Sequence, residues 1–235
     1  MKNFMEDEIF FLAQEKTKRY ERKFFLESFS LSSLKSSIKL HSACFKKHYL
    51  DRQVNSIYLD SFDKKSYSDN IAGIDRRIKT RIRWYGENIN EIHIPILEFK
   101  IKDGFLGRKL HYSFPSFKRK GNLDKNIRFA ARGSDLPDFI KLYLTQLKCS
   151  SVNSYLRQYY LSSDKRFRLT VDSDICFYKA DNKLIERDKS NLIVELKYDE
   201  EYDADARTIS NKFPFRMTKS SKYVTGVGKT LPYFS

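Results

Sequence analysis

Residues 77–85 of the sequence alternate strictly between cationic and mostly apolar side chains. Side chains two residues apart in a β-strand lie about 6.6 Å apart on the same side of the strand. A strand over this segment therefore places Arg77, Lys79, Arg81 and Arg83 in one row, and Trp84 belongs to the opposite, mostly apolar row. A chain with such a strand must bury one face in a core while the other face holds four neighbouring positive charges.

Related rows, with carboxylates mixed in, recur along the chain. The polar sides of the other alternating segments hold these residues: Glu21 and Lys23; Glu98, Lys100 and Lys102; Tyr155, Arg157 and Tyr159; Arg166, Arg168, Thr170 and Asp172; and Glu195 and Lys197. Any one basic strand could be the solvated outer face of a flat sheet. Because several strands share the pattern, we favour a closed sheet whose charged faces point inward. Like charges repel in such a confined space, so we expect a polyanion to fill it.

Eight segments carry the period-two alternation that is typical of strands. They are Arg19–Leu26, Val54–Leu59, Arg76–Tyr85, Ile94–Lys102, Gly107–Phe114, Tyr155–Leu161, Arg166–Tyr178 and Asn191–Tyr198. Helical spacing occurs in residues 31–38, 62–71, 136–147 and 204–213, and residues 118–135 read as a polar connection. The pattern predicts an α+β fold, with an eight-stranded antiparallel β-barrel, helices packed outside it, and a single domain over residues 1–235.

The net charge indicates the class of partner. The chain has 45 Lys and Arg against 30 Asp and Glu, a formal charge of +15, and such an excess attracts anions. Nucleic acid, an acidic lipid surface and oligophosphate all fit this excess. Proteins that bind a duplex usually concentrate their charge on one helix or exposed patch, whereas this chain spreads it over strands from end to end. The distribution favours oligophosphate over nucleic acid.

Other features of the sequence exclude several classes of protein. Cys44, Cys149 and Cys176 form no CxxC pair, so neither a disulfide framework nor a zinc site is indicated, and we expect a reducing, cytoplasmic location. The four histidines lack paired metal spacing, and no nucleophile motif is present. No segment approaches the ~20 apolar residues of a membrane span, and the acidic residues 6–8 do not fit a signal peptide. The oligomeric state is left open.

An ordered set of short motifs resembles the VTC domain of the triphosphate tunnel metalloenzyme (CYTH-like) superfamily. The motifs are R-Y-E-R-K-F (residues 19–24), V-N-S-I-Y-L-D (54–60), R-I-R-W-Y-G (81–86), L-E-F-K (97–100), Y-L-R-Q-Y-Y (155–160), V-E-L-K-Y (194–198) and K-S-S-K-Y (219–223). Each is weak alone, but they follow in order over nearly the whole chain. The resemblance implies an antiparallel triphosphate tunnel that transfers the γ-phosphate of ATP to a growing inorganic polyphosphate chain, with polyphosphate or pyrophosphate as primer.

The resemblance also implies roles for individual residues. Lys23, Arg81, Arg83, Lys100, Arg157, Arg168 and Lys222 would act at the transferred phosphate, and Lys109, Tyr155, Arg166, Lys197, Lys219 and Ser221 would bind other phosphates. Arg166 and Arg168 compete for one role because both lie on the same face of the predicted strand. Glu195 would hold a divalent metal, Mn²⁺ or Mg²⁺, at the nucleotide phosphates. The alternative is that Glu195, like Glu98 and Asp172, serves only as an ion-pair partner.

One position departs from the pattern of the superfamily's hydrolases, which open with ExExK. In this register Arg19 stands in place of the first glutamate, followed by Glu21 and Lys23. VTC domains show a similar replacement. Loss of that carboxylate weakens a second metal site that would activate water, which favours phosphate transfer over hydrolysis. A hydrolase of tripolyphosphate or a nucleoside triphosphate and a non-catalytic polyanion-binding module remain the alternatives.

Overall fold

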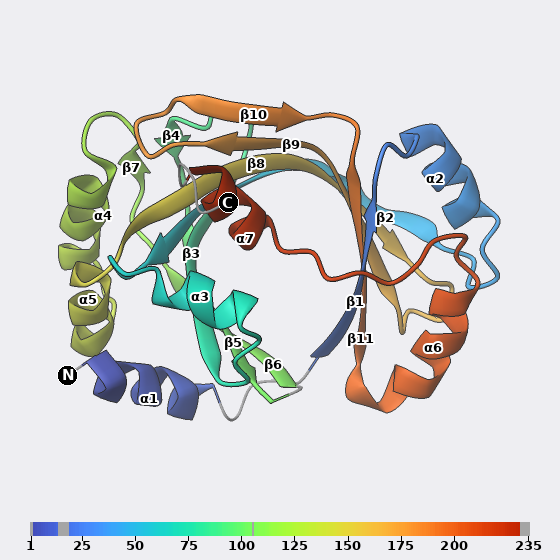
Figure 1. Cartoon of the computed structure of the whole chain (residues 1–235), viewed down its shortest axis with the longest axis horizontal. Coiled ribbons are helices and arrows are strands. Elements are labelled where there is room, and N and C mark those ends of the chain that lie inside the picture. The colour runs from blue at the N-terminus through green and yellow to red at the C-terminus, as the bar shows by residue number, and fades with distance from the viewer. Residues whose placement is uncertain (1, 14–18, 105, 231–235) are drawn as a thin grey trace.

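The computed structural model describes residues 2–13, 19–104 and 106–230 and shows one large, curved antiparallel sheet (Figure 1). Its strands, in chain order, are β1 (Arg19–Leu26), β2 (Lys46–Asp60), β3 (Arg77–Tyr85), β5 (Ile96–Asp103), β6 (Leu106–Ser113), β8 (Lys148–Leu161), β9 (Arg168–Tyr178), β10 (Leu184–Asp188) and β11 (Leu192–Asp199). A separate two-stranded ladder joins β4 (Glu91–Ile92) to β7 (Phe117–Lys118).

The strand order of the large sheet is β1-β11-β9-β8-β2-β3-β5-β6, with β10 paired to β9. All eight strands predicted from the alternation lie on this path, which confirms an α+β fold built on a large antiparallel sheet. β2 begins at Lys46, earlier than predicted. The alternation did not indicate this part of the strand, because its first seven residues are exposed and carry no apolar alternation. The end strands β1 and β6 lie beside each other, but no backbone ladder joins them among the described residues. Closure of the sheet into a tunnel therefore stays a prediction.

Helices lie on both sides of the curve (Figure 1). Those outside it are α1 (Lys2–Leu12), α2 (Leu31–Lys39), α4 (Leu123–Arg132), α5 (Asp138–Thr145) and α6 (Asp203–Asn211), which follows a 3₁₀ turn at Glu200–Tyr202. α7 (Lys222–Thr230) lies across the concave side and contacts α3 (Lys65–Ile71). None of the helices in the described ranges is long and apolar enough to cross a membrane.

The apolar rows of the strands face outward, beneath the outer helices. In one cluster, Ile82 of β3 packs with Ile9 of α1 and Ile140 of α5, and all three are fully buried. In a second, Val194 of β11 packs with Leu34 of α2. Each such buried side chain contributes roughly 1.5–3 kcal/mol. The core of the protein thus lies between the sheet and its outer helices, which leaves the inner face free to be polar.

A buried carboxylate holds α3 and α7 together on the concave side. Asp60, at the end of β2, accepts hydrogen bonds from the backbone N–H groups of Ser66 and Tyr67 at 3.0 and 3.1 Å, which satisfies the start of α3. The same carboxylate accepts a hydrogen bond from the hydroxyl of Tyr223 in α7. Asp60 therefore fixes the position of α7 relative to the sheet.

Three helices escape the sequence prediction: α1, α4 and α7. α1 was not expected, and α4 lies within residues 118–135, so the reading of that segment as a connection is wrong. Leu123, Ile127 and Ala131 recur every four residues and give α4 a buried side. Asn122 caps the helix, because its side chain accepts a hydrogen bond from the backbone N–H of Lys125 at 3.0 Å. The buried side is narrow and lies among charged residues, which hides the helix in the sequence.

Substitution of Gly226 with alanine should destabilise the fold, because this residue lies where α7 meets β8. A Cβ atom at Gly226 would lie 2.2 Å from Oγ of Ser151 and 3.1 Å from Cδ1 of Phe177. Gly228→Ala is the matched control, since its Cβ would approach nothing closer than Oη of Tyr67 at 3.8 Å. Overpacking costs about 1–3 kcal/mol, so we expect Gly226→Ala to be less stable than Gly228→Ala by about that amount in urea unfolding. Equal stability of the two variants would contradict the close packing of α7.

Candidate functional site

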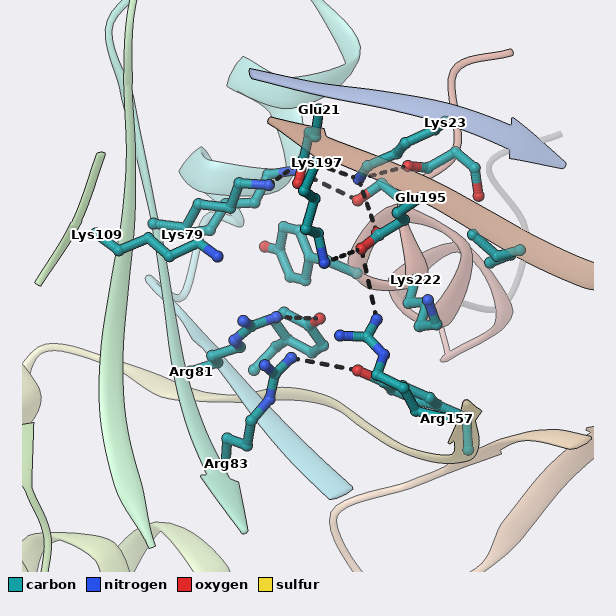
Figure 2. Close-up of a pocket in the computed structure, with 17 residues that line it drawn as sticks. Glu21, Lys23, Lys79, Arg81, Arg83, Lys109, Arg157, Glu195, Lys197 and Lys222 are labelled. Carbon is teal, nitrogen blue, oxygen red and sulfur yellow. Dashed lines mark hydrogen bonds and ion pairs between the residues drawn. The ribbon is translucent and has the colours of Figure 1, made fainter. Parts of the chain in front are cut away.

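A pocket opens inside the curve of the sheet, where the charged rows of the strands meet (Figure 2). Its cationic lining consists of Lys23, Lys79, Arg81, Arg83, Lys100, Lys109, Arg157, Lys197 and Lys222. The rest of its polar lining consists of Glu21, Glu195, Tyr58, Tyr155, Ser220, Ser221 and Tyr223. Nine cations thus face two carboxylates among the described residues of the lining. The sheet carries its charged faces inward and its apolar faces outward, as the alternation predicts.

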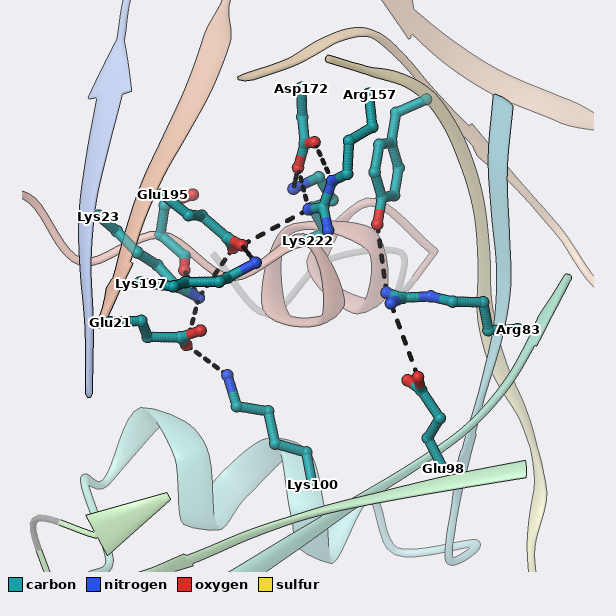
Figure 3. A network of polar contacts seen from close by, with 12 residues as sticks. Glu21, Lys23, Arg83, Glu98, Lys100, Arg157, Asp172, Glu195, Lys197 and Lys222 are labelled. Carbon is teal, nitrogen blue, oxygen red and sulfur yellow. Dashed lines mark hydrogen bonds and ion pairs between the residues drawn. The ribbon is translucent and has the colours of Figure 1, made fainter. Parts of the chain in front are cut away.

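Glu195 of β11 is the centre of an ion-pair network (Figure 3). Its carboxylate lies 2.7 Å from Nζ of Lys197, 3.5 Å from Nζ of Lys23 and 3.5 Å from Nη2 of Arg157. Burial raises the pKa of Glu195, but these cations, Lys197 and Lys23 foremost, outweigh burial and hold the pKa well below its usual range. Glu195 is therefore ionised and available as an oxygen ligand.

Glu21 of β1 links the two ends of the sheet. Its carboxylate lies 3.3 Å from Nζ of Lys23 and forms an ion pair with Lys100 of β5. Burial raises the pKa of Glu21, but Lys100 and Lys23 outweigh it and hold the pKa well below its usual range. The Glu21–Lys100 ion pair spans β1 and β5, which no backbone ladder connects in the described ranges. This side-chain ion pair thus joins two strands that backbone hydrogen bonds do not.

Asp172 of β9 lies beside the pocket and is fully buried. It accepts two hydrogen bonds from the guanidinium of Arg157, at 2.5 Å from Nε and 2.7 Å from Nη2, and it forms an ion pair with Lys222 of α7. A bidentate pair of this kind fixes the orientation of the guanidinium as well as neutralising it. Asp172 therefore positions two of the cations that line the pocket.

Glu98 of β5 holds the arginines of β3 in a similar way. It forms an ion pair with Arg81 and lies 3.7 Å from Nη1 of Arg83. Nη2 of Arg83 also donates a hydrogen bond to the hydroxyl of Tyr155 at 3.2 Å. Burial raises the pKa of Glu98, but Arg81 and Arg83 outweigh it and hold the pKa well below its usual range. Both arginines are thus directed into the pocket.

Lys79 and Lys109 form no ion pair with a carboxylate in the part of the chain that the structure describes. Nζ of Lys79 donates a hydrogen bond to Oγ of Ser221 at 3.3 Å. Burial, together with repulsion from Lys100 and Lys23, lowers the pKa of Lys79 to about 6. Burial of its ammonium group, together with repulsion from Lys100 and Lys197, lowers the pKa of Lys109 to about 7. These two lysines mark the region where positive charge is least compensated.

Most residues predicted for the site meet in this pocket. The structure brings together Lys23, Arg81, Arg83, Lys100, Lys109, Tyr155, Arg157, Glu195, Lys197, Ser221 and Lys222. Three others lie outside its lining. Arg166 is exposed and pairs with two surface aspartates, because β9 begins only at Arg168 and Arg166 belongs to the preceding turn. Arg168 is the ladder partner of Lys197 and so shares its inward face, and Lys219 is exposed in the segment before α7.

Several residues of the pocket were given no role in the site from the sequence. Lys79 stands in the same alternating row as Arg81 and Arg83, so the signal for it was present in the period of two. Tyr58 could have been found in the same way, from the alternation in β2. Tyr223 could not, since its place depends on how α7 packs across the sheet.

The curved antiparallel sheet of this chain has the fold of CYTH-like proteins. An adenylyl cyclase candidate from Hippeastrum, described as having a dominant triphosphatase activity, aligns with 92% of this chain and 98% of its own at 14% identity and a TM-score of 0.54. Adenylate cyclase candidates from Bacillus halodurans (15% identity, 89% and 97% coverage, TM-score 0.51) and Vibrio parahaemolyticus (10% identity, 88% and 97% coverage, TM-score 0.51) align similarly. At these identities the likeness shows the fold alone.

The sequence identifies the family within this class. The profile of the VTC domain matches residues 18–231, and the chain belongs to the VTC domain family. No curated protein sequence matches the chain. Membership confirms the resemblance carried by the ordered motifs and is consistent with polyphosphate or triphosphate chemistry.

The pocket offers oxygen ligands for a divalent metal, which CYTH-like domains generally use. The carboxylates of Glu195 and Glu21 are both ionised and lie within 3.5 Å of the same atom, Nζ of Lys23, so they converge. Mg²⁺ and Mn²⁺ prefer carboxylate, phosphate and water oxygens. No group of three or more His, Cys, Asp or Glu side chains in the described ranges is placed to hold a metal ion by itself. The residues present therefore fit a metal whose coordination is completed by phosphate oxygens.

Binding of tripolyphosphate should be coupled to proton uptake by Lys79. With a pKa of about 6 this lysine is mostly neutral at pH 7.5 in the unliganded pocket, and a bound anion favours the charged form. The affinity should therefore fall as the pH rises above about 6, since each binding event must then supply the proton. Calorimetric titrations in buffers of different ionisation enthalpy measure the uptake.

Comparison of variants separates the contribution of Lys79 from titration of the ligand itself. Lys79→Met should bind fewer protons on complex formation than the unmodified protein at pH 7.5. Lys189→Met, which replaces an exposed lysine outside the pocket, should not differ from the unmodified protein. Unchanged uptake in Lys79→Met would show that Lys79 is already charged in the empty pocket.

Asp172→Asn should lower the free energy of unfolding by about 3–5 kcal/mol, because it leaves the buried cations Arg157 and Lys222 without their shared counter-charge. Tripolyphosphate should raise the melting temperature of this variant more than that of the unmodified protein, since the ligand supplies the missing negative charge. Asp174→Asn, which weakens an exposed pair with Arg187, is the control and should have a small effect. Equal stability of the two variants in urea unfolding would contradict the role of Asp172.

Proposed function

We propose that this chain is a metal-dependent phosphotransferase, a polyphosphate polymerase that transfers the γ-phosphate of ATP to a growing inorganic polyphosphate chain. The observation that supports this best is the charge of the pocket, where nine cations face two carboxylates and each carboxylate is already ion-paired. A single phosphate does not require so many cations, whereas a row of consecutive phosphates does. The proposal includes a closed tunnel within a single domain over residues 1–235, acting in the cytoplasm.

Phosphoryl transfer needs alignment and charge neutralisation more than a protein nucleophile, and the pocket supplies both. In the proposed reaction a terminal oxygen of the polyphosphate chain attacks the γ-phosphorus of ATP. The new P–O bond forms as the bond to the β-phosphate oxygen breaks, and ADP leaves. Arg81, Arg83 and Arg157 present planar forks to phosphate oxygens, and Glu98 and Asp172 fix their directions.

Glu195, with Glu21 beside it, would hold the metal, which when bound would neutralise charge on the nucleotide phosphates. Lys23 lies between the two carboxylates and would bind phosphate oxygens of the nucleotide beside the metal site. Lys100, Lys109, Lys197 and Lys222 provide compact charges for further phosphates, and Tyr155 and Ser221 provide hydroxyl groups. Arg168 and Lys219, outside the lining, would act where the chain enters or leaves the pocket.

Transfer is favoured over hydrolysis by the residue at the start of β1. The backbone of Arg19 pairs with Asp199 at the first position of the strand, ahead of Glu21 and Lys23; its side chain lies outside what the structure describes. A cation in place of a glutamate removes a ligand for a second metal that would activate water. Triphosphate hydrolysis is the second candidate, since the Hippeastrum protein of the same fold is described as a triphosphatase.

Incubation with ATP, Mn²⁺ and a trace of pyrophosphate or short polyphosphate tests the proposal. We expect a ladder of lengthening chains on a polyphosphate-stained gel, and none when a chelator is added. Glu195→Gln should lower the rate at least about a hundredfold, as expected for loss of a metal ligand, while tripolyphosphate still binds. Glu186→Gln, an exposed glutamate paired with Lys229, is the matched control and should keep full activity.

Other outcomes assign the protein elsewhere. Release of free phosphate without a ladder would make the chain a triphosphate hydrolase. Binding of tripolyphosphate without any turnover, in both the unmodified protein and Glu195→Gln, would leave a polyanion-binding module.

A further inference from the structure

Beyond Arg83 and Arg157, the inner face of the sheet changes from cations to tyrosines. Tyr85 follows Arg83 on β3, and Tyr159 follows Arg157 on β8, in each case two residues further along and therefore on the same face, about 7 Å away. Tyr49 of β2 is the ladder partner of Tyr159. Three tyrosines thus extend the wall of the pocket towards solvent, and Tyr49 and Tyr85 are 51% and 43% exposed.

Arg52 of β2 lies among these three rings. The central carbon of its guanidinium is 5.5 Å from the ring centroid of Tyr49, 5.7 Å from that of Tyr85 and 5.8 Å from that of Tyr159. Tyr49 and Tyr159 meet edge to face, with their centroids 5.8 Å apart. Arg52 is exposed and forms no ion pair with a carboxylate of the described residues. We name Tyr49, Arg52, Tyr85 and Tyr159 the aromatic mouth.

The aromatic mouth adjoins the carboxylate side of the pocket. Arg52 is the direct ladder partner of Arg157, whose Nη2 lies 3.5 Å from the carboxylate of Glu195. Tyr159 pairs with Thr170, and Thr170 pairs with Glu195, so two strand spacings of about 5 Å each separate Tyr159 from Glu195. A ligand whose phosphates lie at Glu195 would place the group attached to them at the mouth.

We infer that the aromatic mouth binds the nucleoside of the donor nucleotide, by stacking of its base on the tyrosine rings and the guanidinium of Arg52. The inference rests on the proposed function, which places the phosphates of ATP at Glu195. Every nucleobase has a π-face, and one base stacked on an aromatic side chain changes affinity by about 5- to 150-fold. The cations of the pocket cannot distinguish a nucleoside triphosphate from an inorganic triphosphate. The aromatic mouth therefore provides this distinction.

A path for emerging polyphosphate is the competing use of the same surface. Such a path needs repeated cations, like the rows inside the pocket, whereas the mouth has one arginine among three rings. The guanidinium of Arg52 also lies against those rings, which suits a flat stack more than a row of phosphates. The composition of the mouth therefore favours a base.

Calorimetric titration of ATP and of tripolyphosphate, with a chelator present so that no turnover occurs, tests the inference. Arg52→Ala and Tyr159→Leu should each weaken binding of ATP at least about fivefold and leave binding of tripolyphosphate unchanged. Tyr159→Phe keeps the ring and should keep the affinity for ATP. Arg187→Ala, an exposed arginine on β10 outside the pocket, is the control and should change neither affinity.

Either of two results would overturn the inference. Equal weakening of both ligands would show that the mouth contacts phosphate, and unchanged affinity for both would show that the cluster only packs. Tyr159 is half-buried, so Arg52→Ala, at an exposed position, decides the matter if Tyr159→Leu fails to fold in a thermal melt. Binding is measured without turnover, so the two proposals can fail separately. If the protein binds the base of ATP as expected but makes no polyphosphate, the proposed function is wrong and this inference is still supported.

Discussion

Repulsion among the confined cations is the constraint on which the rest of this structure depends. Nine basic side chains line one pocket, and two unit charges 4 Å apart interact by about 4 kcal/mol at the effective dielectric constant of a protein surface. Four carboxylates, Glu21, Glu98, Asp172 and Glu195, hold this charge together, and each contacts at least two cations. The compensation is incomplete, so the empty pocket retains a strong attraction for anions.

Such an interior is possible only because the fold places its apolar core elsewhere. The strands bury their apolar rows under α1, α4 and α5 on one flank and under α2 and α6 on the other. Burial of these rows supplies the hydrophobic stabilisation that a small barrel normally obtains from a filled interior. The outer helices are thus a condition for the charged interior, because without them the sheet would have no buried face.

The sheet could be predicted from the sequence, whereas the details of the pocket could not. Alternation with a period of two is a property of each strand by itself. All eight strands, and the inward direction of Arg81 or Lys100, could therefore be predicted from the sequence. Helix α4 was not, because its buried side is narrow and lies among charged residues. The sequence also could not separate Arg166 from Arg168, since the boundary between turn and strand depends on the ladder with β11. Asp172 forms ion pairs with both Arg157 and Lys222, which lie on other segments of the chain. These contacts appear only in the folded chain.

The charge in the pocket is divided unevenly between its two sides, and this division bears on how the proposed reaction could be oriented. Three of the four carboxylates lie on β1, β9 and β11, close to one another, whereas the lysines without a carboxylate partner, Lys79 and Lys109, lie on β3 and β6. A metal with its nucleotide suits the side that has three carboxylates, and a metal-free phosphate chain suits the side where Glu98 is the one carboxylate among the four named. The Glu21–Lys100 ion pair lies where these sides meet. In the proposed transfer the γ-phosphorus would lie at that boundary, so that donor and acceptor phosphates approach it from opposite sides, as an in-line displacement requires.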